Sequence, residues 1–494
     1  MAVDIQKGLE LQSAGHLDDA EKIYLEFLKE NPKQPDVLNL LGLVYLQKRF
    51  LDKSIEYFNY AVEGFSCAEY HQNLGLAYYQ NKEYPKAMQC FDAAIGYEDK
   101  NLDFIRNLAQ MAKKAEQTDF AIKFYKICLD LDKKDVIGWN NIGLLYEQKG
   151  DIVNAKNAYV NSLKIKENYE ALHNLGVFYR MQRNFDESIN CLKKALRYKP
   201  HSEITLLSLG MSYLSKKDFN NGYKYYMTKK PEVKSLYKNH WGVEETKGKT
   251  LCVYYDSGFG DQIMFSRYLK IVAEKFDKVR FYCSSELRTL FAKNFLQVEI
   301  MYNRDDDYDY SDNIMYLPYH LKMDFDNIPF AEGYLDAEKS RDDAFCTDKK
   351  KIGLFWQGNY DGYANRAIKL KELAPLLDLQ DCQFYGFVKS DKENQITEFS
   401  QIIDIGKNLG DFYDTAAKLK NLDLFITIDT AAANLAGALG VKTYLMLPKA
   451  SEWRWFDESQ HTDWYKSVTI FKQTENNKWL DVVQRILEDL KKTY

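Results

Sequence analysis

Residues 258–261 (Gly-Phe-Gly-Asp) form the first of three segments that could do chemistry. They follow Lys249–Tyr255, a β-branched and aromatic run typical of a strand, and precede a helical pattern. Gly258 and Gly260 would permit a sharp turn and a close backbone approach. Asp261 would then lie at a helix N-terminus and project toward the crevice at the end of the strand. The structural alternative is a plain N-cap for the helix.

The second segment pairs a strand end with a cation. Trp356-Gln357-Gly358-Asn359 follows a strand expected at 351–356, and Arg366 precedes the next helix. An arginine in such a loop can bind phosphate through two parallel hydrogen bonds. The alternative is a surface arginine. Lys389, after a strand expected at 383–387, is a weaker candidate for a nucleotide contact.

The third segment, residues 427–440, ends a buried strand at Asp429-Thr430 and continues directly into a helix of small residues. The N–H groups of Ala431 and Ala432 and the positive end of the helix dipole would form an anion site, to which Thr430 adds a hydroxyl. The alternative is a tightly packed core helix with Asp429 as its cap.

An acidic segment, residues 303–313, contains Asp305-Asp306-Asp307 and Asp309. An Asp-x-Asp pair could hold a divalent metal for a nucleotide-sugar enzyme of another architecture. We favour a solvated acidic loop, because the carboxylates lie beside one another without strand context or further ligands.

The elements that must position these residues alternate between strands and helices. Strands are expected at 249–255, 279–283, 298–301, 351–356, 383–387, 402–405, 424–428 and 443–447, and helices at 286–294, 370–377, 392–399, 412–419, 431–438 and 479–490. This alternation predicts parallel sheets covered by helices, in two lobes with a break near 340–350. Ligands of such sheets bind at the carboxyl ends of the strands.

The first half of the chain repeats itself every 33 or 34 residues. A small residue, here called the anchor, recurs once in each repeat. Another small residue lies twelve positions after it, and a large residue lies sixteen positions after it. The anchors are Gly42, Gly75, Ala109, Gly143, Gly176 and Gly210. This pattern resembles the tetratricopeptide repeat, a pair of helices that stacks with its neighbours into a superhelix with a concave groove. Six or seven repeats would occupy residues 1–234.

The residues that recur in every repeat build the scaffold. A protein partner would therefore contact residues between these positions. Asparagines lie one to three residues before most anchors, at Asn73, Asn107, Asn140, Asn141 and Asn174. They could bind the backbone of an extended peptide in the groove, or they could be solvated helix residues.

Composition excludes several classes. The formal net charge is −5, so no basic excess indicates a nucleic-acid partner. No apolar run approaches the roughly 20 residues that span a bilayer, and the N-terminus lacks a secretory pattern. The 8 cysteines are dispersed and form no Cys-x-x-Cys pair. We therefore expect reduced cysteines, no metal, no membrane insertion and a cytoplasmic location. The oligomeric state stays open.

The chemical motifs resemble those of bacterial heptosyltransferase-like glycosyltransferases. The resemblance rests on the Gly-x-Gly-Asp segment together with residues 429–440, and the tail from Leu447 through Trp453-Arg454-Trp455 to Tyr465 is similar to the branch fused behind tetratricopeptide repeats. The layout also resembles the eukaryotic protein O-GlcNAc transferase and its fucosyl relatives. The resemblance implies a two-lobed GT-B fold of Rossmann type, with an acceptor lobe at 249–345 and a nucleotide-sugar lobe at 350–494.

Inverting, metal-independent transfer from a nucleotide-diphosphate sugar is the activity that the resemblance implies. Asp261 would be the base, with Gly258, Gly260 and Gln262 on the acceptor side. The donor contacts would be Arg366, Asp429, Thr430, Ala431, Ala432, Lys389 and Gln357. The chain departs from the family pattern at Asn434, where a histidine is usual, and in its short first lobe.

The expected function is a glycosyltransferase acting on a protein that the repeats recruit. The alternatives are a non-catalytic scaffold with a nucleotide-binding domain and a transferase for lipopolysaccharide or another glycan. The sequence names neither the sugar, the base nor the acceptor.

Overall fold

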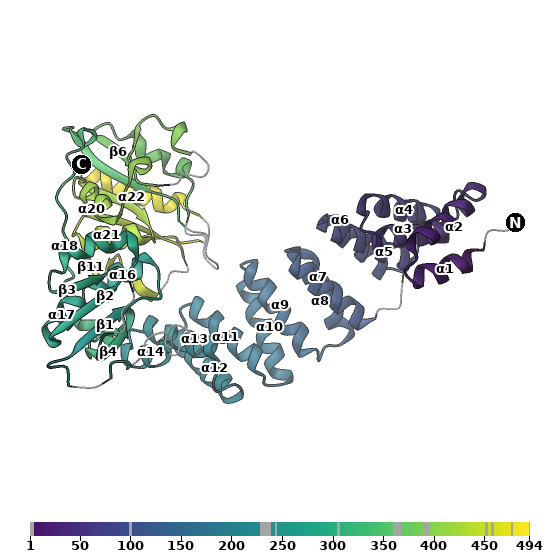
Figure 1. Ribbon diagram of the computed structural model, residues 1–494, viewed down its shortest axis with the longest axis horizontal. Helices are drawn as coiled ribbons and strands as arrows, with labels where there is room; N and C mark the ends of the chain where they lie inside the picture. Colours follow the sequence, from purple (N-terminus) through teal and green to yellow (C-terminus); the bar gives the residue numbers. More distant parts are fainter. Residues whose placement is uncertain are drawn as a thin grey trace. The chain divides into compact units, whose positions relative to one another are not determined.

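The computed structural model describes residues 4–97, 101–227, 239–242, 245–303, 307–358, 367–389, 395–449, 453–455, 459–475 and 478–493 (Figure 1). The chain divides into two compact units, Met1–Phe178 and Tyr179–Tyr494. Within this described part, no helix combines the length and the apolar character needed to cross a bilayer. Arg366, predicted to contact the donor, and Asn359 of the same segment fall outside the described residues.

Paired helices form the repeat region. They are α1 (Ile5–Ser13), α2 (Leu17–Glu30), α3 (Pro35–Gln47), α4 (Leu51–Gly64), α5 (Ala68–Gln80), α6 (Tyr84–Ile95), α7 (Leu102–Lys114), α8 (Thr118–Leu131), α9 (Val136–Gln148), α10 (Ile152–Ile165), α11 (Tyr169–Met181), α12 (Phe185–Tyr198), α13 (Glu203–Ser215) and α14 (Phe219–Tyr226). The predicted helical repeats are confirmed. The last three helices belong to the second compact unit.

The anchor glycines explain the tight packing within each helix pair. A Cβ atom on Gly42 would lie 2.6 Å from the ring of Phe58, and one on Gly143 would lie 2.7 Å from the ring of Tyr159. Both rings are fully buried. The aromatic residue sixteen positions after the anchor therefore fills the space that a larger side chain would take.

The second unit contains two sheets. The first has the order β3-β2-β1-β4, with all neighbours parallel. Its strands are β1 (Thr250–Tyr254), β2 (Lys278–Tyr282), β3 (Val298–Met301) and β4 (Tyr310–Asn313), and its helices are α16 (Phe259–Ser266), α17 (Leu269–Lys275), α18 (Arg288–Asn294) and α19 (Leu317–His320). The prediction that residues 303–313 are all loop is wrong. Tyr310–Asn313 pairs with β1, because backbone hydrogen bonding to a central strand overrides its polar sequence.

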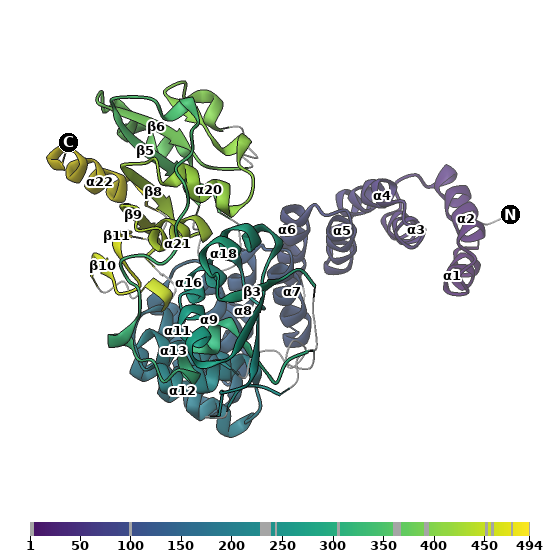
Figure 2. The same cartoon turned by 60° about the vertical axis from the view of Figure 1, so that its left-hand side comes forward.

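The second sheet has the order β10-β11-β9-β8-β5-β6-β7, and only the β10–β11 pair of its described strands is antiparallel. Its elements are β5 (Lys350–Phe355), β6 (Cys382–Gly386), β7 (Ile402–Asp404), α20 (Phe412–Leu419), β8 (Leu424–Ile428), α21 (Ala431–Ala438), β9 (Thr443–Leu447), β10 (His461–Thr462), β11 (Tyr465–Lys472) and α22 (Leu480–Thr493). Helix α22 packs against β11, and both lie on the left of Figure 2. The sequence did not predict β11.

Two expected α-helices in this lobe have a tighter form. Leu370–Asp378 (η5) and Gln395–Glu398 (η6) are 3₁₀ helices. Pro375 lies inside η5 and cannot donate an α-helical hydrogen bond, so an unbroken α-helix is disfavoured there.

Strand order fixes where a ligand would bind. In the chain, β1 is the first strand of its sheet and β5 is the first strand of the other. Each has later strands on both sides, so the order of the strands reverses at β1 and at β5. Such a reversal leaves a crevice at the carboxyl ends of the two central strands. The predicted chemical segments follow β1, β5 and β8, so all three begin at these two points.

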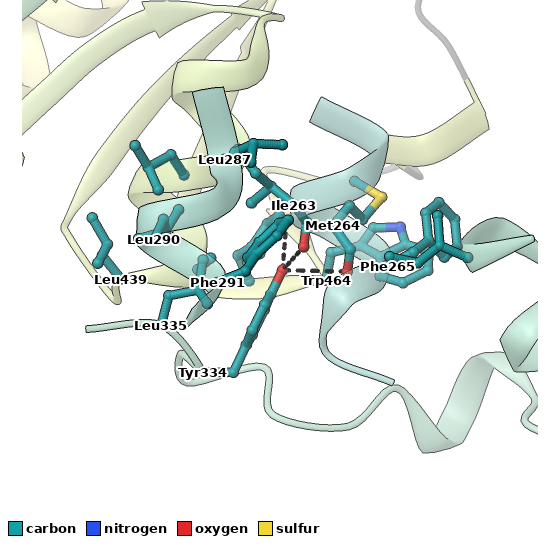
Figure 3. Packing of buried hydrophobic residues seen from close by; sticks show 14 of the residues in the cluster. Ile263, Met264, Phe265, Leu287, Leu290, Phe291, Tyr334, Leu335, Leu439 and Trp464 are labelled. Atoms are coloured by element: carbon teal, nitrogen blue, oxygen red, sulfur yellow. Dashed lines mark hydrogen bonds between the residues drawn. The ribbon is translucent and has the colours of Figure 1, made fainter. Parts of the chain in front are cut away.

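One hydrophobic core joins the two sheets to the last repeat helix. It contains Tyr223 of α14, Ile263 of α16 and Leu435 of α21. Figure 3 shows part of this core, in which the hydroxyl group of Tyr334 donates to the carbonyl of Ile263 at 2.6 Å. The backbone N–H of Tyr334 donates to Ala438 at 2.8 Å. This residue therefore ties α16 to the end of α21.

Candidate functional site

The N-terminus of α16 lies against the N-terminus of α21. A Cβ atom on Gly260 would lie 3.0 Å from Nδ2 of Asn434 and 3.5 Å from Cα of Ala431. The close approach predicted for the glycines is thus found at Gly260. Gly258 has extended backbone with φ −68° and ψ 171°, and a Cβ atom there would meet nothing within 4 Å. Neither of those values requires glycine.

Asp261 is the third residue of α16 and forms an ion pair with Arg454. Nε of the arginine donates to Oδ1 at 2.5 Å, and a terminal nitrogen donates to Oδ2 at 3.2 Å. The side chain of Arg454 is 19% exposed and that of Asp261 is 17% exposed. Gly258 occupies the N-cap, so Asp261 is not the capping residue. A guanidinium that engages both carboxylate oxygens fixes the position of the group and neutralises its charge.

Asp429 is held by the residue next to Arg454. The indole Nε1 of Trp455 donates to its Oδ1 at 2.8 Å. Arg454 and Trp455 belong to one short turn, η8 (Trp453–Trp455). A single three-residue turn therefore contacts the aspartates that follow β1 and β8. These aspartates come from different sheets, and the turn fixes them in one neighbourhood.

Three buried polar atoms lie at the same strand ends. Oγ1 of Thr430, Oε1 of Gln357 and Oγ of Ser257 have no hydrogen-bond partner in the described part of the chain. Thr430 is the N-cap of α21, and its side chain does not cap the helix. Buried polar atoms are rarely unsatisfied, so three of them at the ends of β1, β5 and β8 are consistent with a site for a polar ligand.

Asn434 takes part in the packing of α21. It is 5% exposed, its amide nitrogen donates to the carbonyl of Thr430 at 3.3 Å, and its Oδ1 accepts from the Tyr465 hydroxyl at 3.1 Å. Burial raises the pKa of Tyr465 well above its ordinary value, which keeps this hydroxyl protonated as a donor. Asn434 thus stabilises the first turn of α21.

Gln262 and Lys389 have different surroundings. Gln262 is fully buried; its side chain donates to Ser284 Oγ at 2.8 Å and accepts from the Ser284 N–H at 3.0 Å. These bonds connect α16 to the segment after β2. Lys389 is exposed and donates to the carbonyl of Gly410 at 2.9 Å. Both roles predicted for them at the site stay predictions.

The acidic segment is engaged in ion pairs where the structure describes it. Asp309 accepts from the backbone N–H of Thr250 at 2.8 Å and pairs with Lys249 at 3.1 Å, and Asp307 lies 3.3 Å from Arg280. Asp305 and Asp306 lie outside the described residues. Among the described residues, no group of three or more His, Cys, Asp or Glu side chains is placed to hold a metal ion. All eight cysteines are free.

The repeat asparagines form a ladder in the first unit. Asn73 donates to Asn39 at 3.0 Å, and Asn174 donates to Asn140 at 3.0 Å. Each bond joins the first helices of neighbouring repeats. Asn141 accepts from Lys113 at 3.1 Å, and Asn107 is exposed. The predicted positions therefore include both ordered ladder residues and a solvated one.

The sequence did not predict the roles of Arg454 and Trp455, nor the buried hydroxyl of Ser257. An arginine between two tryptophans, in a tail outside the strand and helix pattern, was the available signal. Its partner Asp261 lies 193 positions away, so no local pattern could pair them.

Models of the tetratricopeptide-repeat family match residues 5–66, 68–101, 138–169 and 169–202. Among curated proteins, FlbA of Caulobacter vibrioides is 22% identical over 433 residues, covering 78% of this chain and 72% of FlbA. This alignment is longer than the repeat region, so it extends into the part of the second unit that contains the two sheets, here called the α/β unit. BBS4, a BBSome complex member from Bos taurus, is 28% identical over 197 residues. The matched segment covers 38% of this chain and 36% of BBS4.

The human protein O-mannosyl-transferase TMTC1 is 23% identical over 35% of this chain and 20% of its own length. Solved structures with likeness include the repeat protein YrrB, at 19% identity, with a TM-score of 0.30 over 37% of this chain and 95% of YrrB. Another is the Naa15/Naa10 complex, at 16% identity, with a TM-score of 0.38 over 47% of this chain and 37% of that one. The N-terminal region of this chain is thus an array of tetratricopeptide repeats, followed by a region of sheets and helices.

Proposed function

We propose that this protein is a glycosyltransferase of GT-B type that transfers a sugar from a nucleotide-diphosphate donor to a protein recruited by its repeats. The observation that carries the proposal is the meeting of the α16 and α21 N-termini, where Asp261 and Asp429 contact one turn. Two sheets whose strand orders both reverse at this point supply an acceptor side and a donor side.

On the donor side, the first N–H groups of α21 lack partners within the helix and carry its positive dipole end. They would bind the diphosphate with Thr430, whose hydroxyl is buried, while Gln357 would contact the nucleotide. Such groups stabilise the negative charge that develops on the leaving nucleoside diphosphate. Arg366 and Lys389 are proposed as further cations for this charge.

On the acceptor side, the Asp261 carboxylate would take the proton of the attacking hydroxyl as the new glycosidic bond forms at the anomeric carbon. The proton goes to the carboxylate, and the bonding electrons of the departing group go to the diphosphate. Attack from the face opposite the leaving group gives inversion. The name of TMTC1 as a protein O-mannosyl-transferase agrees with a protein acceptor.

The test compares cells that produce the wild-type protein with cells that produce Asp261→Asn. Intact-mass analysis of cellular proteins should show added sugar only with the wild type. An altered lipid-linked glycan without any protein mass shift would indicate the glycan transferase instead. Identical products from Asp261→Asn and wild type would refute the role of this aspartate.

A further inference from the structure

The pair between Arg454 and Asp261 carries an inference that rests on the proposed function. Asp261 is the proposed base, yet both of its carboxylate oxygens accept hydrogen bonds from one guanidinium, at 2.5 and 3.2 Å. An acceptor hydroxyl that is to donate to this carboxylate must compete with the guanidinium for the same two oxygens. Full activity therefore requires the guanidinium to leave.

The neighbours of Arg454 and Asp261 connect this ion pair to the proposed diphosphate site. Trp455, its neighbour, contacts Asp429, which directly precedes the N-cap of α21. Gly260, the neighbour of Asp261, packs against Ala431 in the first turn of that helix. The residues next to Arg454 and next to Asp261 thus both contact the start of α21, the helix end proposed to bind the diphosphate. Its forked donors fit phosphate as well as carboxylate.

The backbone of the turn is anchored while the arginine side chain is long. Trp453 is 4% exposed and its ring packs edge-on against Tyr226 of α14, at 6.3 Å between centroids. Trp455 is 1% exposed. Because both flanking residues are fixed, a change of partner requires only rotation of the Arg454 side chain.

We infer that Arg454 is an exchangeable ligand: it pairs with Asp261 before the donor binds and moves to the diphosphate when the donor arrives. The exchange frees the Asp261 carboxylate at the moment when a sugar is in place. The same cation then stabilises the leaving group. Donor binding and base activation are coupled in this way, which limits futile reaction of the free enzyme.

Calorimetric titration of the full-length protein with ADP, UDP, GDP and inorganic pyrophosphate tests the exchange. Asp261→Asn removes the competing carboxylate charge and should tighten binding of the recognised diphosphate several-fold. Arg454→Gln should weaken it by about 10-fold or more, since a hydrogen bond to a charged group contributes roughly 1.5–3 kcal/mol. In the double variant, Asp261→Asn should no longer increase the affinity. Arg341→Gln, an exposed arginine of the same unit, should change nothing.

Arg454→Lys keeps the charge without the fork and should give an intermediate affinity, and equal melting temperatures would exclude loss of folding. Weaker or unchanged binding by Asp261→Asn would overturn the exchange. The absence of binding by all four probes to the wild type would overturn both the exchange and the proposed donor site. The expected affinity changes without any sugar transfer would support the exchange and refute only the enzyme.

Discussion

At the scale of single residues, Arg267 gives the α/β unit much of its internal order. It is fully buried at the end of α16, where Nε donates to Met264 at 2.9 Å and a terminal nitrogen donates to Pro329 at 3.1 Å and to Trp464 at 3.0 Å. The rings of Tyr334 and Tyr465 lie within 5 Å of the guanidinium carbon. One side chain therefore connects α16 to two distant segments.

Arg267→Met should destabilise the α/β unit by about 3 kcal/mol or more, because three buried carbonyl groups lose their donor. The measurement is the denaturant dependence of tryptophan fluorescence, which reports on this unit through Trp464. Arg341→Met is the matched control and should cost less than about 0.5 kcal/mol as an exposed substitution. Equal stability of the two variants would show that Arg267 has no such structural role.

A second prediction at this scale concerns Thr430. Thr430→Val keeps the shape of the side chain and removes the buried hydroxyl. If that group binds a phosphate oxygen, the affinity for the recognised nucleoside diphosphate should fall about 5- to 20-fold, the loss expected for a single hydrogen bond. Isothermal titration measures this change. Thr415→Val, on α20, is a control that should leave the affinity as in the wild type.

At the scale of elements, the repeat helices pack through the anchor glycines. Gly143→Val should destabilise the array by about 1–3 kcal/mol, since its side chain would overlap the buried ring of Tyr159. Gln148→Val places the same side chain on the exposed end of α9 and should cost less than about 0.7 kcal/mol. Chemical denaturation followed by circular dichroism at 222 nm compares the two. If the two variants lose similar amounts of unfolding free energy, the anchor position tolerates a larger residue.

At the scale of the whole molecule, the repeats would select the acceptor while the α/β unit performs the transfer. The double variant Asn140→Ala and Asn174→Ala removes one pair of the ladder. If these amides bind the backbone of the acceptor, the KM for the protein acceptor should rise at least about 5-fold, because about one hydrogen bond is lost with each amide. The kcat and the nucleotide affinity should be unaffected. Asn154→Ala, on the second helix of a repeat, is the control. An unchanged KM would exclude the ladder from acceptor binding.

The sequence predicted those parts of the structure that local pattern controls. Thr430 and Ala431 were expected at a helix start because a buried strand, a β-branched residue and a run of small residues follow one another in the chain. The anchors and their rings were expected because they lie sixteen residues apart. Arg454 and Trp455 could not be assigned, because their partners come from other elements. The strand Tyr465–Lys472 was missed, since its pairing with β9 depends on the finished sheet.

We propose that a nucleoside diphosphate binds where the N-termini of α16 and α21 meet. The most direct test is a thermal-shift comparison of wild-type protein with ADP, UDP, GDP, CDP and their common sugars, repeated with Thr430→Val and Arg366→Ala. A ligand that binds only the folded state raises the melting temperature. One class of nucleotide should raise it for the wild type and much less for the variants. No shift with any nucleotide, or an equal shift in all proteins, would contradict the claim.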